Sequence, residues 1–299
     1  MGDALAGPGR SPGLWGPGPG PGPGPGPGSG PGPTCADDVE RFSERLAALE
    51  PSCSVVVRGS AEYPSNLAGV EGAPAALFVR GTLLASDCSA VSVVGTRRAS
   101  ARGLALARRL GVELVGAGVC VVSGLARGID AAAHAGALSA GGRTIAVLGS
   151  GLACVYPPEH LELAAEIAVA GAVVSQWWPW TPPAPEQFRR RNAVSSGLAL
   201  ATVVVEASAR SGARLQARLA RSQGRLLCVS EAVAASEDWA RVLVSASSAV
   251  VVRGAEDVLG ALNGGTWQDY VLSGFKILPS SRSRPDGLPA SSQLSLDIG

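Results

Sequence analysis

From about residue 90 onward, the chain alternates between short apolar runs and longer segments whose apolar residues recur at helical spacing. Short β-rich runs that alternate with helices are typical of a mostly parallel sheet covered by helices on both faces. The alternation therefore predicts an α/β fold. We expect strands at 90–94, 119–122, 143–148, 172–175 and 201–205 and helices at 100–115, 128–140, 158–169, 185–198 and 210–223, and the segments 225–229, 239–244, 249–252 and 256–262 continue the alternation.

Three consecutive predicted strands end in small residues directly before a predicted helix. The first ends at Gly95-Thr96, the second at Ser123-Gly124 and the third at Gly149-Ser150-Gly151. In a parallel sheet, such turns bring backbone N–H groups and helix N-termini to one edge. The sequence therefore places a ligand crevice at this edge of the sheet.

Composition divides the chain into four parts. Residues 1–34 are expected to be a disordered Pro–Gly arm, because residues 1–33 hold 10 of the 22 Pro and 13 of the 40 Gly and cannot bury apolar surface. Residues 35–88 are expected to be an N-terminal extension that packs on the core. The α/β domain itself is expected at 89–262. Residues 263–299 lose the pattern and are expected to be a flexible tail.

Basic residues are clustered although the formal net charge is only +1. The stretch from Arg97 to Arg127 holds six Arg and one acid, and the stretch from Arg189 to Arg225 holds eight Arg and one acid. Arginine suits bidentate contact with phosphate. Both stretches are expected to meet at the carboxyl edge of the sheet, where they would form a basic crevice typical of a polyanion site.

Several protein classes are excluded by missing motifs. The six cysteines form no Cys-x-x-Cys pair, which argues against a zinc ribbon or a thioredoxin-type site. No apolar run is long enough for a membrane span, and the N-terminus lacks the pattern of a signal peptide, so we expect a cytoplasmic protein. A P-loop and a complete dinucleotide fingerprint are also missing, so no cofactor is predicted. The only histidine besides His134 is His160, and no further ligands cluster nearby, so no metal is predicted.

Two of the predicted turns carry an arginine beside a helix N-terminus. Thr96 is expected to cap the helix after the first strand, and Arg97 to project beside it as a phosphate ligand. Farther along, Arg210 with the backbone amides of Ser211 and Gly212 would make a phosphate nest. A plain strand-to-helix turn is the competing interpretation of the first motif.

Ser123, Asp130 and His134 carry the residue types of a catalytic triad, but their spacing argues against one. Asp130 and His134 lie four residues apart on one predicted helix, so we expect them to hydrogen-bond each other and hold the turn. No Gly-x-Ser-x-Gly elbow precedes them. We therefore expect a structural role for this group.

Aromatic residues adjoin the second basic stretch. Phe188 directly precedes three arginines and would either stack on a nucleic-acid base or belong to the core. Trp177, Trp178 and Trp180 lie in a Pro-rich loop that would either stack on bases or pack as a lid. For this loop we expect packing.

The motifs, taken in order, resemble those of the DNA-processing protein A family (DprA, also called Smf). Each motif is modest, but their order and spacing together are highly specific. The resemblance extends from about Tyr63 to Val258, roughly two-thirds of the chain. It rests on Tyr63-Pro64-Ser65-Asn66-Leu67, Val79-Arg80-Gly81, Val93-Val94-Gly95-Thr96-Arg97, the string from Ser123 to His134, the segment from Gly142 to Gly149, Tyr156-Pro157, Phe188-x-x-Arg191-Asn192, Val205-Glu206-Ala207, Ser211-Gly212 and Gly224-Arg225.

The resemblance implies an extended Rossmann-like fold that binds single-stranded DNA without catalysis. It also implies homodimers and loading of the RecA recombinase during natural transformation or recombination. Residues 89–262 would then be the DNA-binding domain. By matching positions, the DNA-facing residues would be Arg97, Gly124, Phe188, Arg191, Asn192, Arg210, Ser211 and Gly212.

The sequence departs from the family pattern at several positions. Ala193 stands where the family has a second Arg, Gln216 where it has Thr, and Gln176 where it has Glu. The customary Pro-Gly after the Gly-Arg strand is Ser230-Glu231 here, and the Gly-rich turn that should follow reads 236–239 Ser-Glu-Asp-Trp. The dimer-forming region of the family lies toward these last positions.

Two other functions remain open. One is a nucleotide-binding enzyme similar to the phosphoribohydrolases, for which Glu206 is the sole candidate acid in the basic half, although the signature of that group is missing. The other is a degenerate scaffold that keeps the fold and has lost DNA affinity. The last residues, from Gln293 to Ile298, resemble the peptide that docks on the bacterial sliding clamp, and a chance match is the competing interpretation.

Overall fold

The computed structural model describes residues 53–208 and 211–264. The Pro–Gly arm and almost all of the predicted tail, with its clamp-like peptide, lie outside these residues. Within them, nine strands form one sheet in the order β1-β2-β6-β5-β4-β3-β7-β8-β9. The strands are β1 (Cys53–Val57), β2 (Ala76–Gly81), β3 (Ala90–Gly95), β4 (Cys120–Ser123), β5 (Thr144–Val147), β6 (Ala172–Ser175), β7 (Ala201–Glu206), β8 (Leu226–Ser230) and β9 (Val250–Val252).

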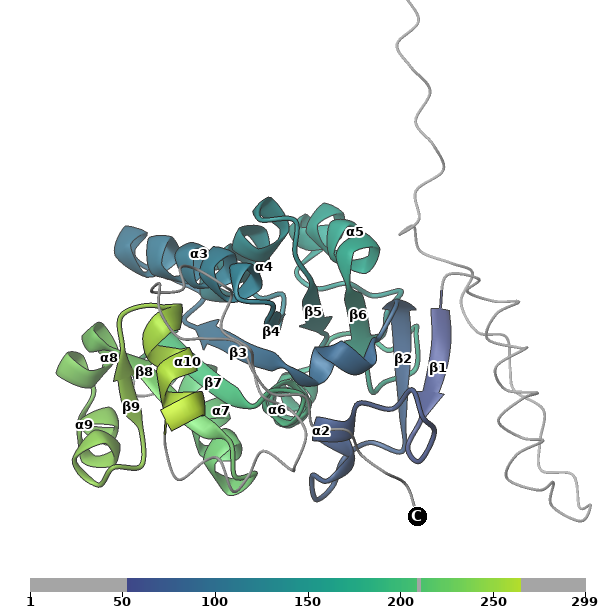
Figure 1. Cartoon of the computed structure of the whole chain (residues 1–299). Helices are drawn as coiled ribbons and strands as arrows, with labels where there is room; N and C mark the ends of the chain where they lie inside the picture. The colour runs from purple at the N-terminus through teal and green to yellow at the C-terminus, as the bar shows by residue number, and fades with distance from the viewer. Residues whose placement is uncertain (1–52, 209–210, 265–299) are drawn as a thin grey trace, which may run out of the picture.

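Helices cover both faces of the sheet, as the alternation of strands and helices predicts (Figure 1). Helices α3, α4, α5 and α10 pack on one face, and α2, α6, α7, α8 and α9 on the other. Figure 1 shows α3, α4 and α5 above the sheet and α6 and α7 below it. The helices are α2 (Ser65–Ala68), α3 (Ala101–Gly116), α4 (Ile129–Ser139), α5 (Leu161–Ala170), α6 (Pro185–Gly197), α7 (Gly212–Ser222), α8 (Glu231–Ser236), α9 (Asp238–Ser245) and α10 (Ala255–Gly264), with 3-10 turns at Ala85–Cys88 and Pro158–His160.

The sheet is parallel from β6 to β9 and antiparallel at its other end. β2 pairs antiparallel with both β6 and β1, with Phe78 opposite Ser175. The predicted fold class, a mostly parallel α/β sheet covered on both faces, is therefore confirmed. The alternation did not predict β1 and β2, because these strands join the sheet by pairing with segments far away in the sequence.

Successive strand residues alternate between the two faces and are almost completely buried. On β3, Val91 and Val93 face α3 and α4, whereas Val94 faces α7. Cys120 and Cys228 are buried as small core residues, as their apolar surroundings predict. Among the described helices, none combines the length and the hydrophobicity that a membrane span requires.

Helices α3 and α4 pack against each other at very short distance through glycines. A Cβ atom on Gly136 would strike the backbone carbonyl of Arg108 on α3. A Cβ atom on Gly111 would in turn strike the carbonyl of Ala133 on α4. Because these contacts are with backbone, the helices have to move apart to accept any larger residue.

We expect the substitution Gly136→Ala to lower the free energy of unfolding by about 1–3 kcal/mol, because the added methyl group overpacks the α3–α4 contact. Gly260→Ala is the matched control, since Gly260 is exposed on α10 and has open space around its Cβ position. This control should gain about 0.5–1 kcal/mol from helix propensity. Urea unfolding of both variants measures the difference, and equal effects would contradict the close packing.

Candidate nucleic-acid interface

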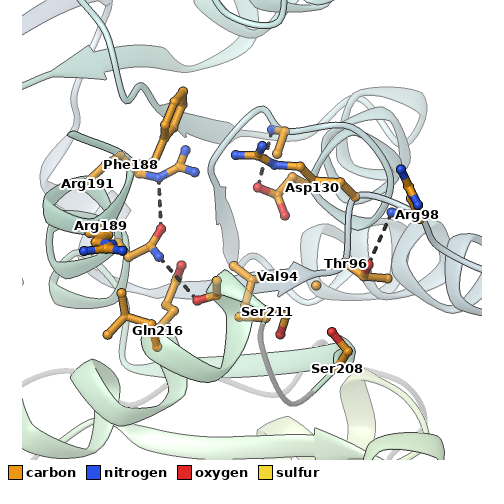
Figure 2. A pocket seen from close by; sticks show the side chains of 17 residues that line it. Val94, Thr96, Arg98, Asp130, Phe188, Arg189, Arg191, Ser208, Ser211 and Gln216 are labelled. Carbon is orange, nitrogen blue, oxygen red and sulfur yellow. Dashed lines mark hydrogen bonds between the residues drawn. The ribbon is translucent and has the colours of Figure 1, made fainter. Parts of the chain in front are cut away.

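A crevice of about 600 Å³ opens at the carboxyl ends of β3 and β7. The chain runs outward from β3 through β4, β5 and β6 and then returns to place β7 on the other side of β3. This is a topological switch point, where open α/β sheets bind their ligands. Figure 2 shows Phe188, Arg189 and Arg191 on one side of the crevice and Asp130, Thr96 and Arg98 on the other.

The turn after β3 presents two arginines to the crevice. Arg97 and Arg98 are both exposed and line it. The hydroxyl of Thr96 accepts a hydrogen bond from the backbone N–H of Arg98, 3.2 Å away, and so holds the turn. The prediction that Thr96 caps the next helix is wrong, because Ser100 is the N-cap of α3 and accepts from the backbone N–H of Gly103.

Glu206 at the end of β7 is a structural partner of this turn. Its carboxylate accepts hydrogen bonds from the backbone N–H of Ser100 at 3.1 Å and from the Ser100 hydroxyl at 2.8 Å. Glu206 does not line the crevice. Glu206, the candidate catalytic acid of the alternative enzyme function, therefore holds the start of α3 through Ser100.

Asp130 holds the turn after β4 from inside the protein. Its buried carboxylate accepts from the backbone N–H groups of Gly124, at 3.2 Å, and Ala126, at 3.4 Å. Burial raises the pKa of Asp130, and nearby Arg191 and the amide donors oppose this rise. The predicted hydrogen bond between Asp130 and His134 is wrong, because the backbone amides of the turn supply the partners of the carboxylate.

His134 is fully buried and bonds to the neighbouring strand β5 instead. Its Nδ1 lies 2.7 Å from the Thr144 hydroxyl, which itself donates to the carbonyl of Val121 at 2.7 Å. The hydroxyl therefore accepts from Nδ1–H, which makes the ring a neutral tautomer with a bare Nε2. This Nε2 has no hydrogen-bond partner among the described residues. Burial lowers the pKa of His134 to about 3.

Arg191 is buried on α6 and reaches across to two strand ends. Its guanidinium donates to the carbonyl of Gly124 and to the carbonyl of Val147, the latter at 2.6 Å. A Cβ atom at position 124 would strike this guanidinium, so the turn requires glycine there. Burial lowers the pKa of Arg191, whereas the charge of Asp130 opposes that shift. Arg191 therefore lines the crevice and also fixes α6 to the sheet.

Phe188 is half-buried and forms a wall of the crevice. The guanidinium carbon of Arg97 lies 5.3 Å from the centre of its ring, within range of a cation–π interaction. On another side the Tyr156 ring lies at 5.7 Å. A small hollow of about 10 Å³ beside Phe188 is lined by Gly124, Arg97 and Arg191 among others. The structure thus places Phe188 between the core and the open crevice.

The N-terminus of α7 also lines the crevice, together with Arg97 and Arg98 of the turn after β3. Ser211 is the N-cap of α7, and its hydroxyl accepts from the backbone N–H of Arg214. The backbone N–H of Ser211 donates to the carbonyl of Ser208 at 2.9 Å. The predicted nest is therefore wrong in part, because this amide already has a partner within its own turn. Arg210 lies outside the described residues.

Gln216 and Asn192 form the polar floor of the crevice. Gln216 is buried and donates to the hydroxyl of Ser92 at 3.0 Å and to that of Ser195 at 3.3 Å. Asn192 is buried and donates to the carbonyl of Gly212 at 3.4 Å. The residue that replaces the family's Thr therefore joins α7 to the sheet beneath the crevice.

Six of the eight predicted DNA-facing residues line the crevice, and Gly124 lies in the adjoining hollow. Sequence analysis missed Arg98 and Arg189 as site residues, although both stand beside residues that it selected. Among the described residues, four arginines and the acid Asp130 line the crevice. The six are Arg97, Phe188, Arg191, Asn192, Ser211 and Gly212.

Not all of the two basic stretches reach this edge. Arg225 precedes β8 at the amino end of the parallel strands and donates to the carbonyls of Asn66 and Gly197. The expectation that both complete stretches meet in the crevice is therefore wrong for this residue. Side-chain direction and strand polarity decide which arginines line the crevice. Counting charges along the sequence gives no information on either.

The tryptophan loop after β6 packs away from the crevice. Trp178 meets Phe78 of β2 edge-on at 5.5 Å and Trp180 at 6.0 Å. Backbone bonds join this loop to the segment after β5, from Gly151 to Thr181 and from Ala153 to Pro179. Packing is therefore the role that the structure gives this loop. The described residues also hold no group of three or more His, Cys, Asp or Glu that could bind a metal ion.

A comparison with known protein families identifies the same family as the order of the motifs. Residues 54–263 match the family described as DNA recombination-mediator protein A. The chain belongs to this family. The resemblance based on motifs is thereby confirmed.

Curated relatives carry the names Smf and DprA. Protein Smf of Escherichia coli (strain K12) is 42% identical over 177 residues, which are 59% of this chain and 47% of that protein. DNA processing protein DprA of Bacillus subtilis (strain 168) is 35% identical over 195 residues, which are 63% of this chain and 66% of that protein. The chain thus spans about half to two thirds of the length of these relatives.

Two solved structures share the fold. DprA from Streptococcus pneumoniae aligns with a TM-score of 0.64 at 30% identity, covering 72% of this chain and 77% of that chain. DprA from Helicobacter pylori, whose structure is described in terms of its single-stranded DNA binding mode, aligns with a TM-score of 0.62 at 24% identity and covers 70% and 95%. The Rossmann-like α/β fold is common to all three proteins.

We expect His134 to make stability depend on pH. Its folded pKa of about 3 lies below the ordinary value of 6.5, so the unfolded chain takes up the proton first as the pH falls. Stability is therefore lost as the pH falls through 6.5 toward 3. Between pH 7 and pH 5 the loss due to this group should be about 2 kcal/mol.

The substitution His134→Asn tests this expectation, because the shorter amide still donates to Thr144 but does not titrate. Urea unfolding of both proteins at pH 7 and pH 5 gives the two changes in stability. The variant should be less stable at pH 7 and lose less stability on acidification than wild type. Equal losses in the two proteins would show that His134 is not held neutral.

Proposed function

We propose that this protein binds single-stranded DNA in the crevice between β3, β7 and α6 and acts without catalysis as a recombination mediator. The observation that carries the proposal is that four arginines line the same crevice as the half-buried ring of Phe188, at the switch point of the sheet, and that Arg97 lies over this ring. Arginines supply phosphate contacts, and an aromatic ring can stack with any base.

The combination of arginines and an aromatic ring in the crevice supports binding of a single strand. Non-sequence-specific binding of single strands combines a positively charged groove with an aromatic platform, because every base has a π-face and every nucleotide a phosphate. Here both elements lie within one crevice of about 600 Å³. Arg191 and Asn192 are buried and support the crevice, so Arg97, Arg98 and Arg189 are the exposed charges available to the backbone of the DNA.

The comparisons support the same proposal. The description of the matching family is DNA recombination-mediator protein A, and the Bacillus subtilis relative is named DNA processing protein DprA. The Helicobacter pylori protein, which shares the fold, is described as binding single-stranded DNA. Loading of RecA, a homodimeric state and a role in natural transformation are further parts of our proposal for this chain.

Removal of a crevice arginine should weaken binding and flatten its salt dependence. We expect Arg97→Ala to reduce the affinity for oligo-dT and for other single-stranded sequences by the same factor. The slope of log K against log salt should become less negative by about 0.7, the value for one lost phosphate contact on a single strand. Fluorescence anisotropy at several salt concentrations measures both quantities, with a duplex as the comparison ligand.

Arg221→Ala is the matched control for Arg97→Ala. Arg221 is also exposed but lies in the last turn of α7, at the end of the helix away from the crevice. Its removal should leave affinity and slope close to wild type. If both variants behave alike, binding does not depend on the crevice and the proposed site is wrong.

Replacement of the aromatic platform should weaken binding without changing the salt slope. We expect Phe188→Leu to cost about 1–3 kcal/mol of binding free energy, because base stacking on the ring is lost. Phe188→Tyr keeps the ring and should retain most of the affinity. The same anisotropy series measures both variants, and a changed salt slope in Phe188→Leu would mean that the ring acts by positioning Arg97.

A further inference from the structure

One buried side chain at the floor of the crevice has a polar atom without a partner. Gln216 is only 3% exposed, and its oxygen Oε1 accepts no hydrogen bond from any residue in the described part of the chain. Oε1 is not among the unpartnered atoms of the described residues that are shielded from solvent, so it is accessible from the crevice that Gln216 lines. Figure 2 shows this side chain pointing from α7 into the crevice. The floor therefore presents an unused acceptor to a ligand.

Two effects fix the direction of the Gln216 amide. Its nitrogen Nε2 donates to the hydroxyl oxygens of Ser92 on β3, at 3.0 Å, and Ser195 on α6, at 3.3 Å, and both serines are completely buried. The four arginines of the crevice attract the oxygen end of the amide dipole and repel its hydrogens. Both effects hold the nitrogen inward and the oxygen toward the crevice.

The neighbouring polar groups of the crevice are already engaged. Asn192 uses both ends of its amide, since Oδ1 accepts from Arg191 at 3.2 Å and Nδ2 donates to the carbonyl of Gly212 at 3.4 Å. Asp130, across the crevice, accepts from the backbone N–H groups of its own turn. Of the two amide side chains on the floor, Gln216 is therefore the one whose oxygen is left for a ligand.

This acceptor discriminates between the parts of a DNA strand. A phosphate group offers only acceptor oxygens and negative charge, so it pairs with the arginines of the crevice and not with Oε1 of Gln216. Bases carry N–H donors on their Watson–Crick edges, and in a single strand these edges are open to protein groups. If the strand lies in the crevice as proposed, the floor at Gln216 therefore receives a base.

The bases differ in what they offer to an acceptor. Cytosine, adenine and guanine each carry an exocyclic amino group that donates hydrogen bonds. Thymine and uracil carry carbonyl oxygens instead, and an oxygen placed opposite Oε1 would leave both acceptors desolvated and unpaired. On the basis of the proposed DNA binding, we infer that Gln216 makes the crevice prefer a base with an exocyclic amino group over thymine or uracil.

Oligo-dC and oligo-dU of equal length are the probes, because their bases share one ring and differ at the amino group and the adjacent ring nitrogen. Fluorescence anisotropy with the full chain, at about pH 8 where cytosine is uncharged, measures both affinities. Wild type should bind oligo-dC about three- to tenfold more tightly, the range for one hydrogen bond to a buried acceptor. Equal affinities would overturn the inference. Tighter binding of oligo-dU would also overturn it, since the amide nitrogen would then face the crevice.

A modified strand tests the same contact without any change to the protein. An oligomer of N4,N4-dimethyl-dC keeps the cytosine ring but has no amino hydrogen to donate. Wild type should bind it no more tightly than oligo-dU. If it binds as tightly as oligo-dC, the amino group is not recognised and the inference is wrong.

Two substitutions of Gln216 assign the preference to its oxygen. Gln216→Met keeps the length of the side chain and removes the acceptor, so the ratio of the two affinities should fall to about 1 while binding of oligo-dU stays close to wild type. Gln216→Glu keeps an acceptor and adds a negative charge, so it should weaken binding of both oligomers and retain the preference for oligo-dC. A preference that persists unchanged in Gln216→Met would mean that another group recognises the base.

Gln223→Met is the matched control on the same helix. Gln223 follows the last residue of α7 and does not line the crevice, and both ends of its amide are bonded, Oε1 to the hydroxyl of Ser196 and Nε2 to the carbonyl of Ala193. The ratio of the two affinities should therefore stay at the wild-type value. A ratio that falls as far as in Gln216→Met would contradict a specific role of Gln216.

Arg97→Ala distinguishes failure of this inference from failure of the proposed DNA site. If wild type binds neither oligomer, or if Arg97→Ala weakens neither, the crevice is not the DNA site and both proposals are wrong. If Arg97→Ala weakens both oligomers and wild type binds them equally, the DNA site stands and only the preference at Gln216 is wrong.

Discussion

The buried charges around the Gly124 turn join α4 and α6 to the carboxyl ends of β4 and β5. The backbone of Gly124 donates to Asp130 and accepts from Arg191, so one residue joins an anion on α4 to a cation on α6. Both side chains are removed from water, and each lowers the electrostatic cost of burying the other. Loss of either partner would leave an uncompensated buried charge, which is far more destabilising than loss of a surface ion pair.

This network explains how a rigid site forms at strand ends, where backbone groups are otherwise free. Arg191 also donates to the carbonyl of Val147, so α6 is fixed to two strand ends at once. Phe188 lies one turn earlier on the same helix and is thereby held beside Arg97. Arg191, one of the predicted DNA-facing residues, thus positions α6, and exposed Arg97, Arg98 and Arg189 carry the charge that faces solvent.

Helix α6 borders a different space on each of two faces. One face supplies the aromatic wall and polar floor of the crevice, and another borders a cavity of about 180 Å³ beside the loop at 70–74. At its C-terminal end the helix packs closely on α2, where a Cβ atom on Gly197 would crowd the side chain of Leu67. The N-terminal extension therefore supports α6 as well as extending the sheet.

The sequence by itself determined the mostly parallel sheet, the edge at which the crevice opens and six of the residues that line it. Periodicity, small residues at strand ends and the order of motifs can be read along the chain. Because parallel strands bring their carboxyl ends to one edge of the sheet, these features also predict where the crevice opens. Only the tertiary structure decided which partner each polar group takes. Asp130 bonds to backbone amides and not to His134, Ser100 and not Thr96 caps α3, and Arg225 lies at the opposite edge. Several partners of similar strength compete for each of these groups, and burial and distance, which depend on packing between remote segments, select among them.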